Sequence, residues 1–168
     1  GCDNDHHHNS NTGNVKQAEL ETRNIKLLTI NGQQFKDLNK NGKLDKYEDW
    51  RLDSETRAKD LTSQMTVEEK AGAMMHGTIT LDDAGRVDFA TTDNEISNIY
   101  VNTFITRMAG NPAHISADNN KLQETAENTR LGIPVTISTD PRNHFVNDPE
   151  ATSVAAGSFS QWPETLGF

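Results

Sequence analysis

Residues 54–75, Ser54-Glu-Thr-Arg-Ala-Lys-Asp-Leu-Thr-Ser-Gln-Met-Thr-Val-Glu-Glu-Lys-Ala-Gly-Ala-Met-Met75, set the architecture of the chain. Ala58, Leu61 and Met65 recur at helical spacing behind Ser54, which predicts a helix from Ser54 to Met65 with Ser54 as its N-cap. Thr66-Val-Glu-Glu69 is a capping box that starts a second, shorter helix. The apolar run Gly72–Met75 that follows predicts a short buried strand.

The same alternation of helix and strand continues along the chain. Ile99–Ile105 and Ile133–Thr139 have strand composition, and Ser116–Arg130 is a predicted helix that turns Leu122 and Ala126 inward. The polar segment Thr78–Asn94 between them is predicted to be a loop. Short apolar strands that alternate with helices indicate an α/β fold with a parallel sheet, although about three strands are too few to close a barrel.

Upstream lies a predicted hairpin, because Asn31-Gly32 separates two short β-prone runs. The twelve residues Asp37-Leu-Asn-Lys-Asn-Gly-Lys-Leu-Asp-Lys-Tyr-Glu48 then match the calcium-loop pattern D-x-[DN]-x-[DN]-G-x5-E. Gly42 provides the sharp turn, and Glu48 offers two oxygens to the ion. The predicted ligands of a structural Ca2+ are Asp37, Asn39, Asn41, the carbonyl of Lys43, Asp45 and Glu48. The alternative is a loop of Asx-turns that binds no metal ion and only caps a helix. Residues Tyr47–Trp50 are predicted to form that helix.

Composition narrows the classes of function. The 168 residues carry 16 Lys and Arg against 25 Asp and Glu, a net charge of −9, with no basic cluster, which argues against a nucleic-acid partner. Hydrophobic residues make up 33% of the chain, a low value for a domain that buries a closed core alone. Either much of the chain is loop, or its apolar faces are completed by other parts of a protein.

The N-terminus resembles a processed bacterial lipoprotein. The single cysteine, Cys2, stands before a polar tract from Asp3 to Asn14, which predicts a lipid on Cys2, attachment to a membrane and a flexible tether. The alternative is a cysteine without a role. His6-His7-His8 within this tract is interpreted as linker rather than as a metal site or a tag remnant.

Four segments together resemble the start of a family 3 glycoside hydrolase of the β-glucosidase type: residues 35–51, 57–77, 123–142 and 159–168. The motif L-T-x-x-M-T-x-E-E-K, at Leu61–Lys70, is characteristic of the opening of that family's barrel. The resemblance implies the incomplete N-terminal portion of a (β/α)8 TIM-like barrel, with a sugar site at the carboxyl ends of its strands. It divides the chain into a tether (1–22), the hairpin with an EF-hand-like calcium loop (23–50) and the first part of the barrel domain (51–168).

The resemblance also implies a retaining, exo-acting enzyme that removes terminal β-linked sugars outside the cytoplasm, in the periplasm or on the cell surface. Asp140 matches the aspartate that binds the outer hydroxyls of the terminal sugar, and helix or loop capping is its alternative role. Arg142 is either a sugar ligand or an ion-pair partner. The register departs from the family at Asn143-His144, so His144 receives no role.

Four further aspartates and one histidine are interpreted as structural. His76 is expected to be a core histidine, and the aspartates of the polar segment are expected to be solvated: Asp82, Asp83, Asp88 and Asp93. The family's nucleophile, its Lys-His pair and its acid/base match no residue here. This chain alone is therefore predicted to be inactive and to need the remainder of the barrel. The alternative function is a calcium-stabilised surface lipoprotein that binds glycans or serves adhesion without catalysis.

Overall fold

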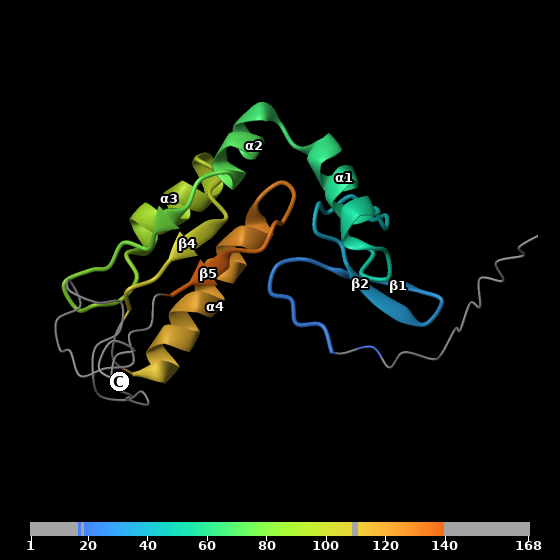
Figure 1. Cartoon of the computed structure of the whole chain (residues 1–168). Helices are drawn as coiled ribbons and strands as arrows, with labels where there is room; N and C mark the ends of the chain where they lie inside the picture. The colour runs from blue at the N-terminus through green and yellow to red at the C-terminus, as the bar shows by residue number, and fades with distance from the viewer. Residues whose placement is uncertain (1–16, 18, 109–110, 140–168) are drawn as a thin grey trace, which may run out of the picture.

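A computed structural model of the chain describes residues 17, 19–108 and 111–139 (Figure 1). Its parallel sheet has the order β3-β4-β5, and a separate antiparallel pair joins β1 to β2. The elements, in chain order, are β1 (Leu27–Ile30), β2 (Gln33–Lys36), α1 (Ser54–Gln64), α2 (Val67–Ala73), β3 (Gly77–Thr78), α3 (Phe89–Asn98), β4 (Thr103–Ile105), α4 (Pro112–Asn128) and β5 (Thr136–Ser138). The predicted mixed α/β class is confirmed. Closure into a barrel stays a prediction.

The β1–β2 hairpin forms at the Asn-Gly pair, as predicted. Asn31 and Gly32 have φ angles of 52° and 78°, both in the left-handed region that a two-residue hairpin turn requires. Phe35 on β2 is fully buried and stacks on Trp50, with 5.6 Å between the ring centroids. This stacking fixes the hairpin against the segment that follows the predicted calcium loop.

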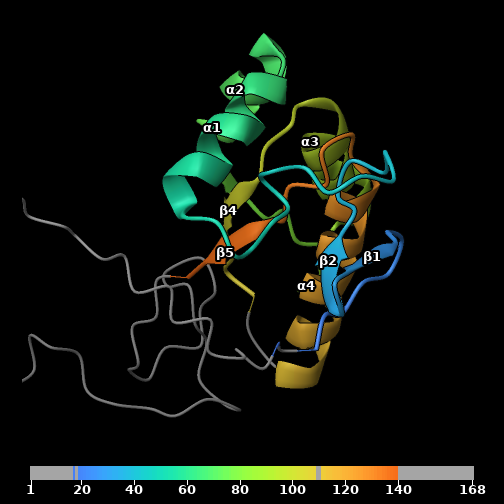
Figure 2. The ribbon, with the colours of Figure 1, turned by 90° about the vertical axis from the view of Figure 1, so that its right-hand side faces the viewer.

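Helices α3 and α4 cover one face of the parallel sheet. Phe104 of β4 lies in register with Gly77 of β3 and Ile137 of β5, and it is fully buried together with Leu122 and Ala126 of α4. Figure 2 shows both helices on the same side of β4 and β5. Because strand side chains alternate between faces, the neighbours of Phe104 project to the opposite face, which no helix of the described residues covers.

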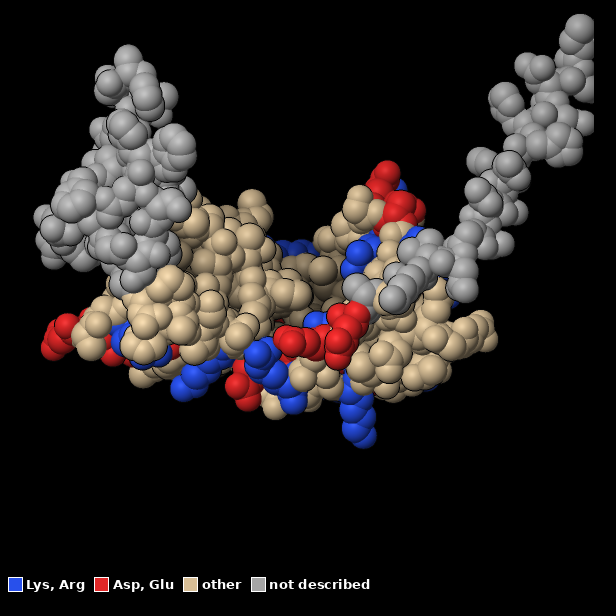
Figure 3. All heavy atoms as spheres, turned by 90° about the horizontal axis from the view of Figure 1, so that it is seen from below, with Lys and Arg blue, Asp and Glu red and all other residues tan. Residues whose placement is uncertain are grey.

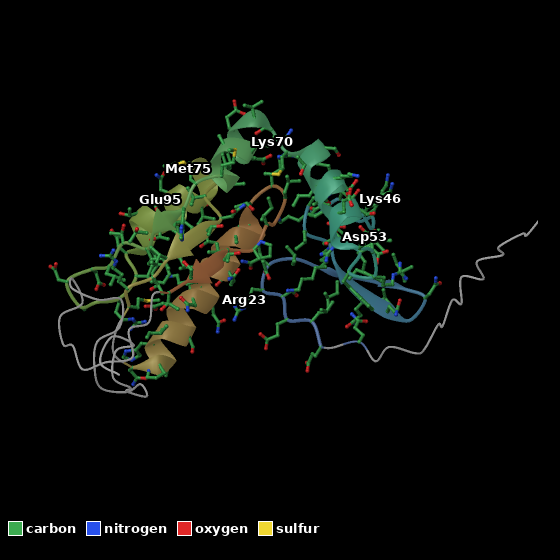
Figure 4. The ribbon with its side chains drawn as sticks, viewed as in Figure 1. Arg23, Lys46, Asp53, Lys70, Met75 and Glu95 are labelled. Atoms are coloured by element: carbon green, nitrogen blue, oxygen red, sulfur yellow. The ribbon has the colours of Figure 1, made fainter. Side chains whose placement is uncertain are left out.

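The predicted strand at Gly72–Met75 is wrong. The capping box at Thr66 starts α2 as expected, but the helix continues through Ala73 and ends at a C-cap on Met74. Gly72 is needed there, because a Cβ atom on it would lie 2.3 Å from the carbonyl oxygen of Ile99. Met74 is 87% exposed and Met75 58%, so neither methionine is buried (Figure 4 labels Met75 beyond the end of α2).

Three other helix predictions need correction. Asp53, not Ser54, is the N-cap of α1 (Figure 4), and Ala58 is exposed because α1 buries none of its side chains. The segment predicted as loop contains the start of α3, where Asp88 accepts hydrogen bonds from two backbone amides. α4 begins four residues earlier than predicted, at Asn111-Pro112, a pair with a capping side chain and a proline in the first turn.

Two further features concern the surface charge and the length of the helices. In Figure 3, Lys and Arg side chains lie interspersed with Asp and Glu, so that face presents no continuous field of one sign. Among the described residues, no helix combines the length and the apolar character needed to cross a bilayer.

Candidate calcium loop and carboxyl edge of the sheet

The three parallel strands bring their carboxyl ends to one edge, as the resemblance implied. The amide of Thr106, just after β4, donates to the carbonyl of Ser138 at the end of β5, with 2.9 Å between the atoms. Asp140 and Arg142, the predicted sugar ligands, follow β5 but lie outside the described residues, as do Cys2, His6–His8 and His144. Their roles stay predictions.

His76 is not the core histidine that was expected. It is exposed, and its Nε2 lies 3.1 Å from Oγ of Ser138, which in turn donates to the carbonyl of Phe104. The contact joins the first and last strands of the sheet on the face that the helices leave open. Sequence spacing alone gave no signal for this pairing.

The polar segment before α3 is organised by charged side chains rather than simply solvated. Asp82 and Asp83 are exposed, as predicted, but Asp82 accepts the amides of Ala84 and Arg86, each at 2.9 Å. Arg86 makes a two-pronged ion pair with the buried Asp118 of α4. Hydrogen bonding to Arg86 holds the pKa of Asp118 below its ordinary value. A polar cavity of about 210 Å³ lies beside this pair.

Residues 37–48 curl as a calcium loop does. Gly42, with φ of 75°, makes the turn, and its amide donates to Oδ2 of Asp37 at 3.0 Å. The amide of Asn41 donates to Oδ1 of Asn39, and the amide of Lys43 donates to Oδ1 of Asn41. These Asx-turns hold side-chain oxygens inside the curve. Both alternatives raised from the sequence, a cation site and a purely structural turn, begin with this backbone arrangement.

Two buried carboxylates favour the cation site. Asp37 is 4% exposed, and its Oδ1 has no hydrogen-bond partner, which is costly for a buried carboxylate oxygen. Glu48 is equally buried and accepts the amides of Asn39 and Asp45, at 3.2 and 3.0 Å. Burial raises the pKa of Glu48 above its ordinary value. A bound cation would satisfy the free oxygen of Asp37 and lower the cost of burying both charges.

The remaining side chains fit a calcium ion better than a softer metal. The side-chain amides of Asn39 and Asn41 both donate to Oδ2 of Asp45, at 2.6 and 2.7 Å, so all three side chains converge. Within the described part of the chain, no three His, Cys, Asp or Glu side chains cluster as a metal site does, so Asp37, Asp45 and Glu48 alone do not make a site and the amide and carbonyl oxygens are needed as well. An all-oxygen set with amides and a carbonyl suits Ca2+, which accepts such mixed ligands. The segment from Tyr47 to Trp50, predicted to be helical, forms turns instead.

The parallel sheet β3-β4-β5 and its carboxyl edge define the class of this chain as an α/β segment. Folds of this class bind ligands at the carboxyl ends of their parallel strands. No model of a known protein family matches the chain. It is 55% identical over 161 residues, 91% of its length, to a "Periplasmic beta-glucosidase/beta-xylosidase" of Dickeya chrysanthemi. It is also similar to a "Probable beta-glucosidase C" of Aspergillus oryzae, at 40% identity over 72% of the chain, and to "Beta-glucosidase C" of Emericella nidulans, at 39% over 66%.

These similarities show that the chain is related to glycoside hydrolases of the β-glucosidase type. The resemblance stated from the four sequence segments is confirmed at this level. The chain spans about a quarter of the length of its bacterial relative, 24%, and 20% of the Aspergillus oryzae protein.

Proposed function

We propose that this chain forms the N-terminal part of the catalytic barrel of an exported, retaining β-glucosidase-type enzyme that acts on terminal β-linked sugars. The observation that carries the proposal is the 55% identity across 91% of the chain to a protein named as a periplasmic β-glucosidase/β-xylosidase. The parallel sheet supports it, because β5 ends at the edge where such folds bind ligands, and Asp140 follows β5 by two residues in the sequence. That relative's name favours a location outside the cytoplasm, and the lipoprotein-like Cys2 favours a lipid anchor there.

In this proposal, Asp140 accepts hydrogen bonds from hydroxyl groups of the terminal sugar, and Arg142 assists. A carboxylate has about four lone-pair sites, so one side chain can hold two adjacent hydroxyls. The double displacement requires a nucleophile and a separate acid/base, which the remainder of the barrel supplies. This chain alone therefore contributes binding but no hydrolysis.

Two measurements on the purified 168-residue chain test these assignments. We expect no turnover of an aryl β-glucoside, and turnover above a buffer control would overturn the division of roles. We also expect glucose or xylose to bind weakly in a calorimetric titration, with binding lost in Asp140→Ala and kept in Asp83→Ala, a matched control in an exposed loop. Equal binding by both variants would remove Asp140 from the site.

We further propose that the 37–48 loop binds Ca2+ as a structural ion, with the ligands predicted from the sequence. The support is the buried, unpartnered oxygen of Asp37 together with the converging side chains of Asn39, Asn41 and Asp45. Bound Ca2+ would supply positive charge that balances the loop's carboxylates. Native mass spectrometry should detect one Ca2+ per chain, lost in Asp37→Ala and retained in Asp83→Ala. Absence of bound Ca2+ at millimolar concentration would end this part of the proposal.

A further inference from the structure

The calcium loop is attached to the turn that precedes β5. The hydroxyl of Tyr47 donates to the carbonyl of Leu131 at 3.1 Å, in a buried position. The ammonium group of Lys40 donates to the carbonyl of Thr129 at 2.7 Å and to that of Leu38 in its own loop at 3.2 Å. Neither side chain is a predicted calcium ligand, yet both come from within the twelve-residue loop.

A third contact brings the two backbones together. Gly132, with φ of 57°, approaches Leu38 so closely that a Cβ atom on it would lie 2.6 Å from the carbonyl oxygen of Leu38. Leu38 lies between the predicted ligands Asp37 and Asn39. Loop positions 2, 4 and 11 thus hold the segment Thr129–Gly132, which ends α4 and leads into β5.

The held segment is continuous with the sheet. The amide of Val135 bonds to the side chain of Gln123 on α4, and the amide of Thr136 bonds to the carbonyl of Asn102 just before β4. The strand that begins there runs to Ser138, two residues before Asp140. A displacement of the loop backbone at Leu38 would therefore act first on the start of β5.

We infer that Tyr47 and Lys40 are positioning residues that couple occupancy of the 37–48 loop by Ca2+ to the placement of β5. Without the cation, the buried carboxylates of Asp37 and Glu48 have no positive charge to balance them, so the loop opens more often. Each opening breaks the contacts to Thr129 and Leu131, so the start of β5 loosens with it. The inference rests on the calcium part of the proposed function.

Hydrogen exchange read by NMR on the 168-residue chain, with CaCl2 or with EGTA, measures this coupling. A ligand that binds only the closed loop multiplies the ratio of closed to open loop by one plus the ligand concentration divided by Kd. Amide hydrogens exchange from the open form, so Ca2+ at 100 times its Kd should slow exchange about 100-fold. We expect this slowing both at Gly42 in the loop and at Val135 and Thr136. In Tyr47→Phe, Gly42 should keep the slowing, while at Thr136 it should fall to about fivefold or less.

Lys59→Met is the matched control for a second variant, Lys40→Met, because it removes an exposed ammonium group that pairs with Glu55 within α1, and it should behave as the unmodified chain does. If Tyr47→Phe fails to fold, Lys40→Met breaks the second contact and should give the same uncoupling. Slowing at Gly42 without slowing at Thr136 in the unmodified chain would overturn the coupling and leave the calcium site standing. Absence of any Ca2+ effect, or of Ca2+ in native mass spectra, would overturn both.

Discussion

A single methyl group at Gly132 tests how closely the loop and the start of β5 pack. Gly132 and Gly85 both have left-handed φ angles, 57° and 72°, but an added Cβ at Gly85 meets nothing within 4 Å. At Gly132 the same atom would lie 2.6 Å from a backbone oxygen and 3.1 Å from the Cβ of Leu38. The two Gly→Ala substitutions therefore share a backbone cost and differ only in the steric one.

The shared cost is about 1–2 kcal/mol for placing an L-residue in the left-handed region, offset by about 0.5 kcal/mol of lost freedom in the unfolded chain. At Gly132 the added methyl group would also clash with the carbonyl oxygen of Leu38, a backbone atom that cannot rotate away. This clash adds about 1–3 kcal/mol to the loss of unfolding free energy. We therefore expect Gly85→Ala to lose about 1 kcal/mol of unfolding free energy, and Gly132→Ala about 2–4 kcal/mol.

Thermal unfolding followed by far-ultraviolet circular dichroism, with CaCl2 present, measures this difference. For a chain of this size 1 kcal/mol corresponds to about 2–4 °C in Tm, so Gly132→Ala should melt at least about 2 °C below Gly85→Ala. Equal melting temperatures for the two variants would show that Leu38 does not approach Gly132, and the argued contact between loop and turn would fail with it.

Three further outcomes are expected. Removing Ca2+ with EGTA should lower Tm in the unmodified chain but not in Asp37→Ala; an equal drop in both would show that the cation acts elsewhere. Asp118→Asn should cost about 2 kcal/mol at pH 7, since it removes a charged hydrogen bond from Arg86. Folding lowers the pKa of Asp118 below its unfolded value of about 4. The stabilisation by its charge is therefore complete above that pH and is lost as the pH falls through the folded-state pKa. Chemical denaturation should show the unfolding free energies of the unmodified chain and of Asp118→Asn converging in acid. Thr66→Ala should cost about 1 kcal/mol by the same assay, because it breaks the capping box of α2, whereas the exposed Thr62→Ala should cost less.

Local signals in the sequence predicted those parts of the fold that depend on neighbouring residues. The Asn31-Gly32 turn, the capping box at Thr66 and the inward pair Leu122 and Ala126 all form as expected. Each follows from a backbone or packing rule that acts over at most four residues. The β-glucosidase relationship was likewise recognisable from short motifs.

The errors arose where distant contacts decide. The backbone of α2 at Gly72 packs against the carbonyl of Ile99, where only glycine fits, and nothing in residues 70–77 reveals that neighbour. His76 is exposed because it lies on the open face of the sheet, where it pairs with Ser138, 62 residues away. The contacts of Tyr47 and Lys40 with the α4–β5 turn were also missed, since they join residues more than 80 positions apart.

Helix α1 shows how a helix without a buried side chain keeps its place. The carboxylate of Asp60 accepts the amide of Tyr47 at 3.0 Å, and the guanidinium of Arg57 donates to the carbonyl of Tyr47 at 3.1 Å. Two charged side chains, Asp60 and Arg57, rather than a stripe of apolar residues, attach α1 to the backbone of Tyr47. A saturation-mutagenesis map of α1 should therefore show strong effects at Arg57, Asp60 and the cap Asp53, and tolerance at exposed positions such as Glu55 and Lys59.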